Sequence, residues 1–299
     1  MKNPQPYLMR SLMFVPAHNE RLMNSAARSE ADVFLLDVED SVQPVSNKIN
    51  ARGNIKKFIQ QGIFKGRVVF PRINDKESGQ LLKDVSELTI PGITGFMYPK
   101  AYTGQDIFFI DKLLETIEYE KNFPKGTFKL IPLIETTAAV LNAQEICQAS
   151  DRVIAIAFGC EDFITDLEGI HDSKGQSIFT SRAMIAMAAR ANNVVPIDTV
   201  HINVHDLEDL EINLNLARNL GFEGMLVLNP KEIPLVHQIY SPSKEEVEDA
   251  EEMLHLAEEA KKEGKGVAVK GDKFIGPPMV LAAKKTLEKN KLILKKQAI

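Results

Sequence analysis

The stretch VFLLDVED, residues 33–40, decides the fold because it joins an unbroken apolar run to a group of acids. Residues 33–36 are all apolar, which is typical of a parallel strand that is covered on both faces. Asp37, Glu39 and Asp40 follow at once, and carboxylates do not favour burial. A buried strand that ends in acids predicts the wall of a barrel, with a polar site at its rim.

Similar apolar runs recur along most of the chain. The predicted strands are residues 11–17, 33–40, 67–74, 93–100, 128–136, 153–162, 194–202 and 224–230. Amphipathic helical stretches lie between them, for example residues 19–28, 78–88, 137–148 and 207–221. This alternation predicts an α/β fold, the (β/α)8 TIM barrel. An open doubly wound sheet is the alternative, but the first turn, VPAHNER at 15–21, lacks the glycine-rich GxGxxG pattern.

The chain changes character after residue 240. SKEEVEDAEEMLHLAEEAKKEG, residues 243–264, predicts a charged helix in which Ser243 and Glu246 form a capping box. VAVKGDKFIGPP interrupts this helix, and PMVLAAKKTLEKNKLILKK resumes helical periodicity. We therefore expect a catalytic barrel over residues 1–240 and a C-terminal helical arm over residues 241–299, which packs on a neighbouring subunit.

Composition narrows the class of protein. The formal net charge is −5, so there is no basic excess to bind a phosphate backbone and nucleic acid is not an expected partner. Cys147 and Cys160 do not form a CxxC motif, which argues against a disulfide framework and favours a reducing cytoplasm. The N-terminus lacks the apolar core of a signal peptide, and no apolar run is long enough to cross a membrane. We expect a cytoplasmic protein without a membrane partner.

Polar residues collect at the ends of successive predicted strands. They are Asp37, Glu39, Asp40, Arg72, Lys100, Glu135 and Asp162. In a barrel, the carboxyl ends of all strands meet on one face, where barrel enzymes carry out chemistry. We therefore expect these side chains to share one site.

Glu135 and Asp162 end neighbouring predicted strands and should face a common point. Two close carboxylates repel unless one is protonated or a cation lies between them. Mg²⁺ accepts one or two protein carboxylates together with oxygens from substrate. The alternative is a salt-bridged pair. No His/Cys motif indicates zinc, and His201 and His205 are more typical of surface or hydrogen-bonding histidines.

Arg72 is the cation of the predicted site. A guanidinium binds a carboxylate through two parallel hydrogen bonds and stabilises a developing oxyanion. It could equally pair with the acids of residues 37–40, and both roles are compatible. Lys48 and Arg52 follow on the next helix, where they either neutralise these acids or face solvent.

Several of these motifs occur together in one order. They are RSLMFVPA, LLDVEDSV with the downstream KINAR, PRIN, LIPLIET, AFGCEDFITDLEG and GFEGMLVLNPKEIPLVHQIYSPSKEEVEDA. Together they resemble the citrate lyase β-subunit family, within the HpcH/HpaI aldolase group. LIPLIET and GCEDF are the most specific parts, and the similarity covers nearly the whole chain.

The resemblance implies a Mg²⁺-dependent barrel that cleaves or forms a carbon–carbon bond. The implied substrates are 3-hydroxy-acyl thioesters of citryl, malyl or citramalyl type, carried on coenzyme A or an acyl carrier protein, which yield a keto acid and an acyl thioester. Glu135 and Asp162 are then the metal ligands and also contact substrate, with Arg72 and Lys100 completing the substrate-binding set. Glu39, Asp37 and Asp40 lie by metal-bound water or the substrate hydroxyl as catalytic residues. A homotrimer or hexamer is implied, with other lyase subunits as further partners.

The sequence departs from this family in the arm. Family members commonly read GKMID near the C-terminus, where the Asp is an acid/base group supplied by the neighbouring subunit. Here the chain reads GDKFIG, with Gly276 at the matching place and Asp272 four residues earlier. Asn229 and Met225 also stand where the family often has histidine and lysine. Two alternatives follow: an aldolase of the same group on a different hydroxy or keto acid, or a non-catalytic subunit that binds metal and keto acid.

Overall fold

The computed structural model describes residues 7–172, 175–264, 266–271 and 273–297. The chain divides into two compact units, one containing Met9–His237 and the other starting at Gln238. The sequence predicts the boundary after residue 240. Asp272, noted above, lies outside the described residues.

The first unit is built on one sheet of eight parallel strands, in the order β3-β2-β1-β8-β7-β6-β5-β4. The strands are β1 (Ser11–Pro16), β2 (Val33–Asp37), β3 (Val68–Val69), β4 (Gly95–Tyr98), β5 (Lys129–Ile134), β6 (Ala155–Phe158), β7 (Val195–Asp198) and β8 (Gly224–Val227). Each strand is separated from the next along the chain by helix, as predicted. The expected TIM barrel is confirmed.

Arg72 joins the two edges of this sheet. It forms parallel bridges to Asp37 on β2 and to Met97 on β4. The Arg72 N–H donates to the Leu36 carbonyl at 3.1 Å, and the Met97 N–H donates to the Pro71 carbonyl at 2.9 Å. Pro71 has no N–H to give to a ladder, which is consistent with regular pairing in β3 ending before it. The backbone after β3 therefore nearly closes the ring and carries Arg72 to its rim.

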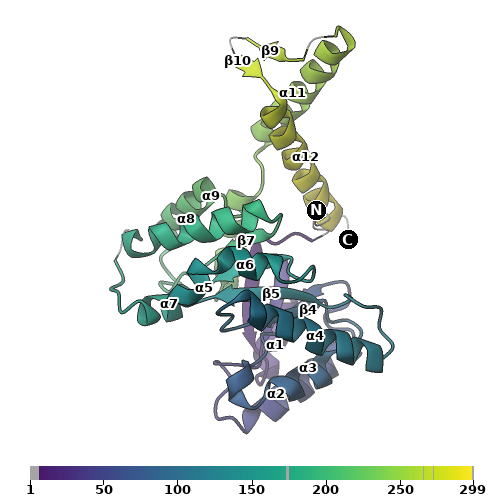
Figure 1. Ribbon diagram of the computed structural model, residues 1–299, viewed down its shortest axis with the longest axis vertical. Coiled ribbons are helices and arrows are strands. Elements are labelled where there is room, and N and C mark those ends of the chain that lie inside the picture. The colour runs from purple at the N-terminus through teal and green to yellow at the C-terminus, as the bar shows by residue number, and fades with distance from the viewer. Residues whose placement is uncertain (1–6, 173–174, 265, 272, 298–299) are drawn as a thin grey trace. The chain divides into compact units, whose positions relative to one another are not determined.

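Helices surround the ring of strands (Figure 1). They are α1 (Glu20–Ala27), α2 (Asn47–Gln60), α3 (Leu81–Leu88), α4 (Gly104–Glu120), α5 (Thr137–Leu141), α6 (Ala143–Gln148), α7 (Cys160–Asp166), α8 (Gln176–Ala191) and α9 (Leu207–Leu220), with short 3-10 turns η1 (Lys76–Ser78) and η2 (Pro230–Glu232). Helix α10 (Ile233–Tyr240) follows η2. The predicted helix 137–148 is divided at Asn142, whose side-chain N–H donates to the Tyr102 carbonyl at 3.1 Å.

The second unit pairs two long helices, α11 (Lys244–Lys262) and α12 (Pro277–Gln297), with the antiparallel strands β9 (Ala268–Lys270) and β10 (Lys273–Ile275). Ser243 and Glu246 form the predicted capping box at the start of α11. Ala260, Ala268 and Ile275 form a small buried cluster here. Among the described residues, no helix is both long and apolar enough to cross a membrane.

Candidate active site at the carboxyl ends of the strands

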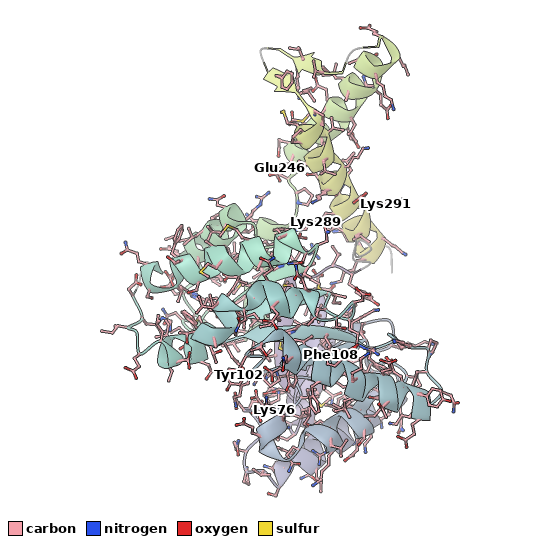
Figure 2. All side chains as sticks on the ribbon, in the orientation of Figure 1. Lys76, Tyr102, Phe108, Glu246, Lys289 and Lys291 are labelled. Atoms are coloured by element: carbon pink, nitrogen blue, oxygen red, sulfur yellow. The ribbon has the colours of Figure 1, made fainter. Side chains whose placement is uncertain are left out.

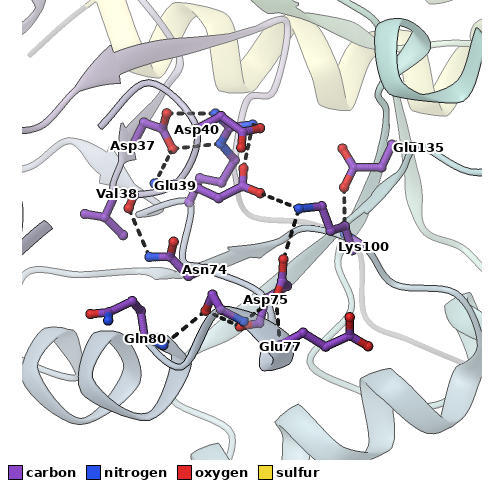
Figure 3. Close-up of polar contacts among 12 residues, drawn as sticks. Asp37, Val38, Glu39, Asp40, Asn74, Asp75, Glu77, Gln80, Lys100 and Glu135 are labelled. Atoms are coloured by element: carbon purple, nitrogen blue, oxygen red, sulfur yellow. Dashed lines mark hydrogen bonds and ion pairs between the residues drawn. The ribbon is translucent and has the colours of Figure 1, made fainter. Parts of the chain in front are cut away.

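Four predicted site residues follow four neighbouring strands of the ring. Asp37 is the last residue of β2, Arg72 follows β3, Lys100 follows β4 and Glu135 follows β5. Parallel strands deliver their carboxyl ends to the same face. Figure 3 shows Lys100 joined by dashed lines to Glu39, Asp75 and Glu135. The sequence argument that strand ends converge therefore holds for this part of the site.

Arg72 is the hub of the cluster. Its Nε and Nη2 donate to the two carboxylate oxygens of Asp37, each at 2.7 Å. Its Nη1 lies 3.0 Å from Glu39 Oε2 and 3.6 Å from Asp40 Oδ2. The guanidinium carbon also lies 4.7 Å from the centre of the Phe14 ring, within cation–π distance. The paired alternative for Arg72 is thus present, and Nη1 is the nitrogen nearest to the remaining acids.

Asp37 is ionised by its surroundings although it is buried. Burial alone would raise its pKa, but the Arg72 charge and the hydrogen bonds from Arg72 and Ser41 lower the pKa below its usual value. The Glu39 N–H adds a hydrogen bond to Asp37 Oδ1 at 3.0 Å. Asp37 therefore holds Arg72 in place and has its lone pairs occupied.

The carboxylate of Glu39 has fewer polar contacts than that of Asp37. It is 4% exposed, and neither carboxylate oxygen has a hydrogen-bond partner among the described residues. Arg72 and Lys100 lie only within ion-pair range, Lys100 Nζ being 3.6 Å from Oε1. Burial, opposed by Arg72, raises the pKa of Glu39 to about 7. A carboxyl group with a pKa near neutrality can both accept and donate a proton at physiological pH.

Lys100 connects three acids from an unusual backbone conformation. Its φ is +50°, a left-handed value that is uncommon for residues other than glycine. Its backbone N–H donates to Glu135 Oε1 at 2.6 Å, while its Nζ lies 3.0 Å from Asp75 Oδ2. Burial would lower the pKa of Lys100, but Asp75 and Glu39 raise it, so the side chain stays cationic.

Glu135 is the most buried of the predicted metal ligands, at 3% exposure. Burial first, and then the charge of Glu39, raise the pKa of Glu135 to about 8, and the charge of Asp162 adds to the rise. Gly159 makes room for this carboxyl group, since a Cβ at 159 would lie 2.8 Å from Glu135 Cβ and 3.1 Å from Oε2. The close approach of Glu135 therefore explains why the GCEDF motif begins with glycine.

The position of Asp162 differs from the prediction that it ends a strand. Strand β6 stops at Phe158, so Asp162 does not end a strand but lies in the first turn of α7, where it is exposed. Burial and the charge of Asp40 raise its pKa, while Arg72 and Lys100 oppose the rise. Asp162 therefore senses the same charges as the strand-end residues. Glu39 and Asp40 likewise lie beyond the end of β2, on the loop that follows it.

The cluster contains more carboxyl groups than cations. Two cations, Arg72 and Lys100, face five carboxyl groups, those of Asp37, Glu39, Asp40, Glu135 and Asp162. The pKa values of Glu39, Glu135 and Asp162 are all raised, which is the direction that a bound cation would reverse. The candidate metal ligands are all carboxylate oxygens, the ligand type that Mg²⁺ prefers. These residues therefore fit a hard divalent ion.

Lys48 and Arg52 do not behave as predicted. Both are buried, and neither faces solvent. Lys48 Nζ donates to the backbone carbonyls of Val38 and Glu39, at 3.2 and 3.0 Å. Arg52 Nη1 pairs with Asp84 at 2.8 Å. Lys48 therefore holds the backbone of the loop after β2, and Arg52 joins α2 to α3. These contacts are not with the carboxylates of residues 37–40.

Asn74 and Asp84 support the site; the sequence places Asn74 at a strand end without a role and does not indicate Asp84. Asn74 Nδ2 donates to the Val38 carbonyl at 3.0 Å and to Asp84 Oδ2 at 2.6 Å, and its Oδ1 accepts from Lys48. Asn74 belongs to the PRIN motif, which was a signal for it. Asp84 lies on α3, and nothing local in the sequence marks it.

Lys76 and Tyr102, both labelled in Figure 2, follow β3 and β4 in the chain. Asp106 connects them, since it accepts from Lys76 Nζ at 2.6 Å and from the Tyr102 N–H at 3.1 Å. This ion pair ties η1 to the start of α4. It fixes the loop that holds Asp75, the partner of Lys100.

Residues from the other sequence arguments lie elsewhere. His201 is buried with Nε2 3.7 Å from Asp209 Oδ2, and His205 is exposed. Asn229 caps η2, where its Oδ1 accepts from the Lys231 N–H at 3.1 Å. Gly276 lies between β10 and α12, and a Cβ there would meet the Phe274 ring at 2.8 Å.

A nearly closed ring of eight parallel strands with carboxyl groups, an arginine and a lysine at its carboxyl face defines a TIM-barrel protein with an acid-rich site. The family model for HpcH/HpaI aldolase/citrate lyase matches residues 10–230, and the chain belongs to this family.

Individual relatives agree with this assignment. The chain is 32% identical over 281 residues to citrate lyase subunit beta of Leuconostoc mesenteroides subsp. cremoris, covering 94% of this chain and 93% of the relative. It is 29% identical over 282 residues to an L-malyl-CoA/beta-methylmalyl-CoA lyase of Rhodobacter capsulatus, covering 88% of each. The protein CitE of Mycobacterium tuberculosis, solved in complex with magnesium, acetoacetate and coenzyme A, has a TM-score of 0.72 and 25% identity, covering 95% of this chain and 99% of that one.

Proposed function

We propose that this protein is a divalent-metal-dependent carbon–carbon lyase that cleaves a 3-hydroxy-acyl thioester into a keto acid and an acyl thioester. The observation that carries the proposal is the convergence of Glu39, Glu135, Arg72 and Lys100 at one face of the barrel in a member of this family. The names of the relatives, a citrate lyase subunit and a malyl-CoA lyase, support the reaction class.

Glu135 and Asp162 are the proposed ligands of Mg²⁺. Their raised pKa values and the excess of oxygen donors around them support a hard cation there. When bound, the ion supplies a Lewis acid for the hydroxyl oxygen that becomes a carbonyl oxygen. The magnesium complex of the Mycobacterium tuberculosis relative is in accord with this choice of metal.

Arg72 is the proposed binding group for the keto-acid carboxylate. Its Nε and Nη2 are held by Asp37, so the guanidinium is fixed in orientation before substrate arrives. Nη1 then offers a charged donor to a substrate oxygen, in competition with Glu39 and Asp40. Lys100 adds a second positive charge on the same side. Fixed donors of this kind stabilise an anion without further reorganisation.

Glu39 is the proposed acid/base group. It takes the proton of the substrate hydroxyl, the C–C bond breaks, and the electron pair passes into the thioester enolate. The enolate carbon must then gain one proton, and the proton held by Glu39 balances the reaction. Neither carboxylate oxygen of Glu39 has a hydrogen-bond partner among the described residues, so neither is committed to a protein donor when the proton is transferred. Gly276 has no side chain that could supply a second acid.

The direct test is condensation in the reverse direction. Purified protein with Mg²⁺, acetyl-CoA and either glyoxylate or oxaloacetate should form a hydroxy-acyl-CoA that mass spectrometry detects. Glu39→Gln should lower kcat by about 100-fold or more, as expected for loss of a general acid/base. Glu120→Gln, at an exposed glutamate at the end of α4, is the matched control and should retain most activity.

Gly276 favours one competing function, a subunit that binds metal and keto acid without turnover. Binding of oxaloacetate with Mg²⁺ but no product from any acyl thioester, on coenzyme A or on a carrier protein, would support that function and refute the lyase. Product from a different hydroxy or keto acid without a thioester would indicate an aldolase.

The arm is proposed to pack on a neighbouring subunit in a homo-oligomer. Its own exposed apolar side chains, Val269 and Phe274 on β9 and β10, support an interface. Light scattering on the full chain and on a variant carrying Val269→Asp and Phe274→Asp tests this. A trimer or hexamer that dissociates in the variant is the expected result, and a monomeric wild type would contradict it.

A further inference from the structure

Cys160, Glu161 and His171 form a compact group of ligand types at the start of α7. Glu161 Oε1 lies 3.3 Å from Cys160 Sγ and 3.0 Å from His171 Nε2. The three ligand atoms all lie within 4.8 Å of one another. The sequence showed no zinc motif here, because Cys160 and His171 are eleven residues apart, which is not a typical ligand spacing. The loop after α7 brings His171 back to Glu161.

These separations resemble the edges of a tetrahedral metal site. With metal bonds of about 2.0–2.1 Å to nitrogen or oxygen and 2.3 Å to sulfur, tetrahedral angles place neighbouring ligand atoms about 3.3–3.6 Å apart. The tetrahedral separation is about 3.6 Å for sulfur and oxygen and about 3.3 Å for nitrogen and oxygen, so the observed 3.3 and 3.0 Å each need a shift of only a few tenths of an ångström. Little rearrangement would be needed for one ion to contact all three atoms.

The donor set selects the kind of metal. A thiolate, an imidazole and a carboxylate suit Zn²⁺ and related thiophilic ions, whereas Mg²⁺ takes oxygen ligands. The proposed Glu135–Asp162 site contains only oxygens. The two sites therefore differ in chemistry although Asp162 follows Glu161 in sequence.

A cavity of about 250 Å³ adjoins the three ligands. Arg182 and His201 also line it, and both are buried. Arg182 Nη1 and His201 Nε2 have no hydrogen-bond partner among the residues that the structure describes. A site with three protein ligands beside a polar cavity has room for a water or an anion at a fourth position, as in open zinc sites.

We propose that Cys160, Glu161 and His171 bind a thiophilic divalent metal ion, with Zn²⁺ as its natural representative, and that the fourth position opens into the cavity lined by Arg182 and His201. Its three proposed ligands differ from Glu135 and Asp162, the proposed ligands of the lyase centre. The inference does not depend on the proposed function.

Burial sets the main cost of binding. It raises the pKa of the Cys160 thiol to about 12, and the charge of Glu161 adds to the rise, so the ion must displace a proton. The Thr199 hydroxyl opposes the rise by hydrogen bonding to the sulfur. A donor of this kind next to a ligand sulfur stabilises the thiolate once it has formed.

The test uses Co²⁺ as a spectroscopic probe of the full chain, freed of metal and kept in excess Mg²⁺ to occupy oxygen sites. Wild type should develop a near-ultraviolet thiolate-to-Co²⁺ band that saturates at one equivalent, and Zn²⁺ should abolish the band by displacement. Cys160→Ala should lose the band. His171→Ala should weaken binding by about 100-fold or more, since outer-shell changes alone cost about 10–100-fold.

Matched variants locate the site. Cys147→Ala removes the other cysteine of the chain, and His205→Ala removes an exposed histidine, so both should keep the band. Glu135→Gln should keep it as well. No band in wild type, a band that survives Cys160→Ala, or unchanged affinity in His171→Ala would overturn the proposal. Loss of the band in Glu135→Gln would place the ion in the oxygen site and overturn it too.

Discussion

Replacing Glu135 by glutamine should make the metal-free protein more stable at alkaline pH. Glutamine keeps the shape of the side chain but cannot ionise. The native carboxyl group is 3% exposed, and burial raises its pKa from 4.5 to about 8. The folded state therefore binds more protons than the unfolded state between these two values. Stability must fall as the pH rises through this window.

The size of the effect follows from the pKa. A rise from 4.5 to about 8 corresponds to at most about 5 kcal/mol of lost stability once the group is ionised in both states. Unfolding of wild type and Glu135→Gln should be followed by circular dichroism with chelator, from pH 6 to pH 8.5. Each kcal/mol is worth roughly 2–4 °C in Tm for a protein of this size class. The variant should gain several degrees relative to wild type as the pH rises.

Magnesium should reverse this order. Binding requires the ionised carboxylate, so Mg²⁺ should stabilise wild type increasingly as the pH rises and should not stabilise Glu135→Gln. Glu118→Gln is the control, because Glu118 is buried but paired with Arg152 and its pKa is lowered. That variant should lose stability at every pH in this range without changing the slope. Equal pH slopes in wild type and Glu135→Gln would refute the reasoning.

The remaining predictions concern three other positions. Asp162→Asn should abolish stabilisation by Mg²⁺ and leave the metal-free Tm nearly unchanged, because Asp162 is exposed. Asp166→Asn is the control and should keep the stabilisation. If Asp162→Asn also keeps it, Asp162 is not a metal ligand. Arg72→Lys should weaken oxaloacetate binding in calorimetry by about tenfold or more and destabilise the protein by about 1–3 kcal/mol, since Asp37 loses its paired hydrogen bonds; unchanged affinity would contradict the role. Gly276→Asp should leave kcat within about threefold of wild type if Glu39 alone moves the proton, and turnover seen only in this variant would show that the native chain lacks its acid.

The strands could be predicted because burial on both faces leaves a continuous apolar signature. The runs around Phe34 and Ile131 are such signatures, and both residues are fully buried. The carboxyl ends of parallel strands share one face by geometry, so Asp37, Arg72 and Glu135 were expected together. Strand ends were predicted too far along the chain. Asp162 shows this, because a polar residue after an apolar run does not reveal whether a helix has already begun.

Supporting contacts could not be predicted because they join residues that are far apart in the chain. Arg52 and Asp84 form an ion pair because α2 packs on α3. The spacing of four between Lys48 and Arg52 on α2 does not indicate this pair. Lys48 reaches backbone carbonyls, which have no sequence signal.

The sequence by itself determined the barrel, the family and the set of acids and bases at the rim, since each depends on local pattern or on order along the chain. Only the tertiary structure decided how the charges are distributed among them. Arg72 is bound by Asp37, and the buried Glu39 carboxylate has no hydrogen-bond partner in the part of the chain that the structure describes. Folding of the loop after α7 brings His171 to Glu161 beside Cys160. Charge interactions depend on distance and burial, and both are set when the ring closes.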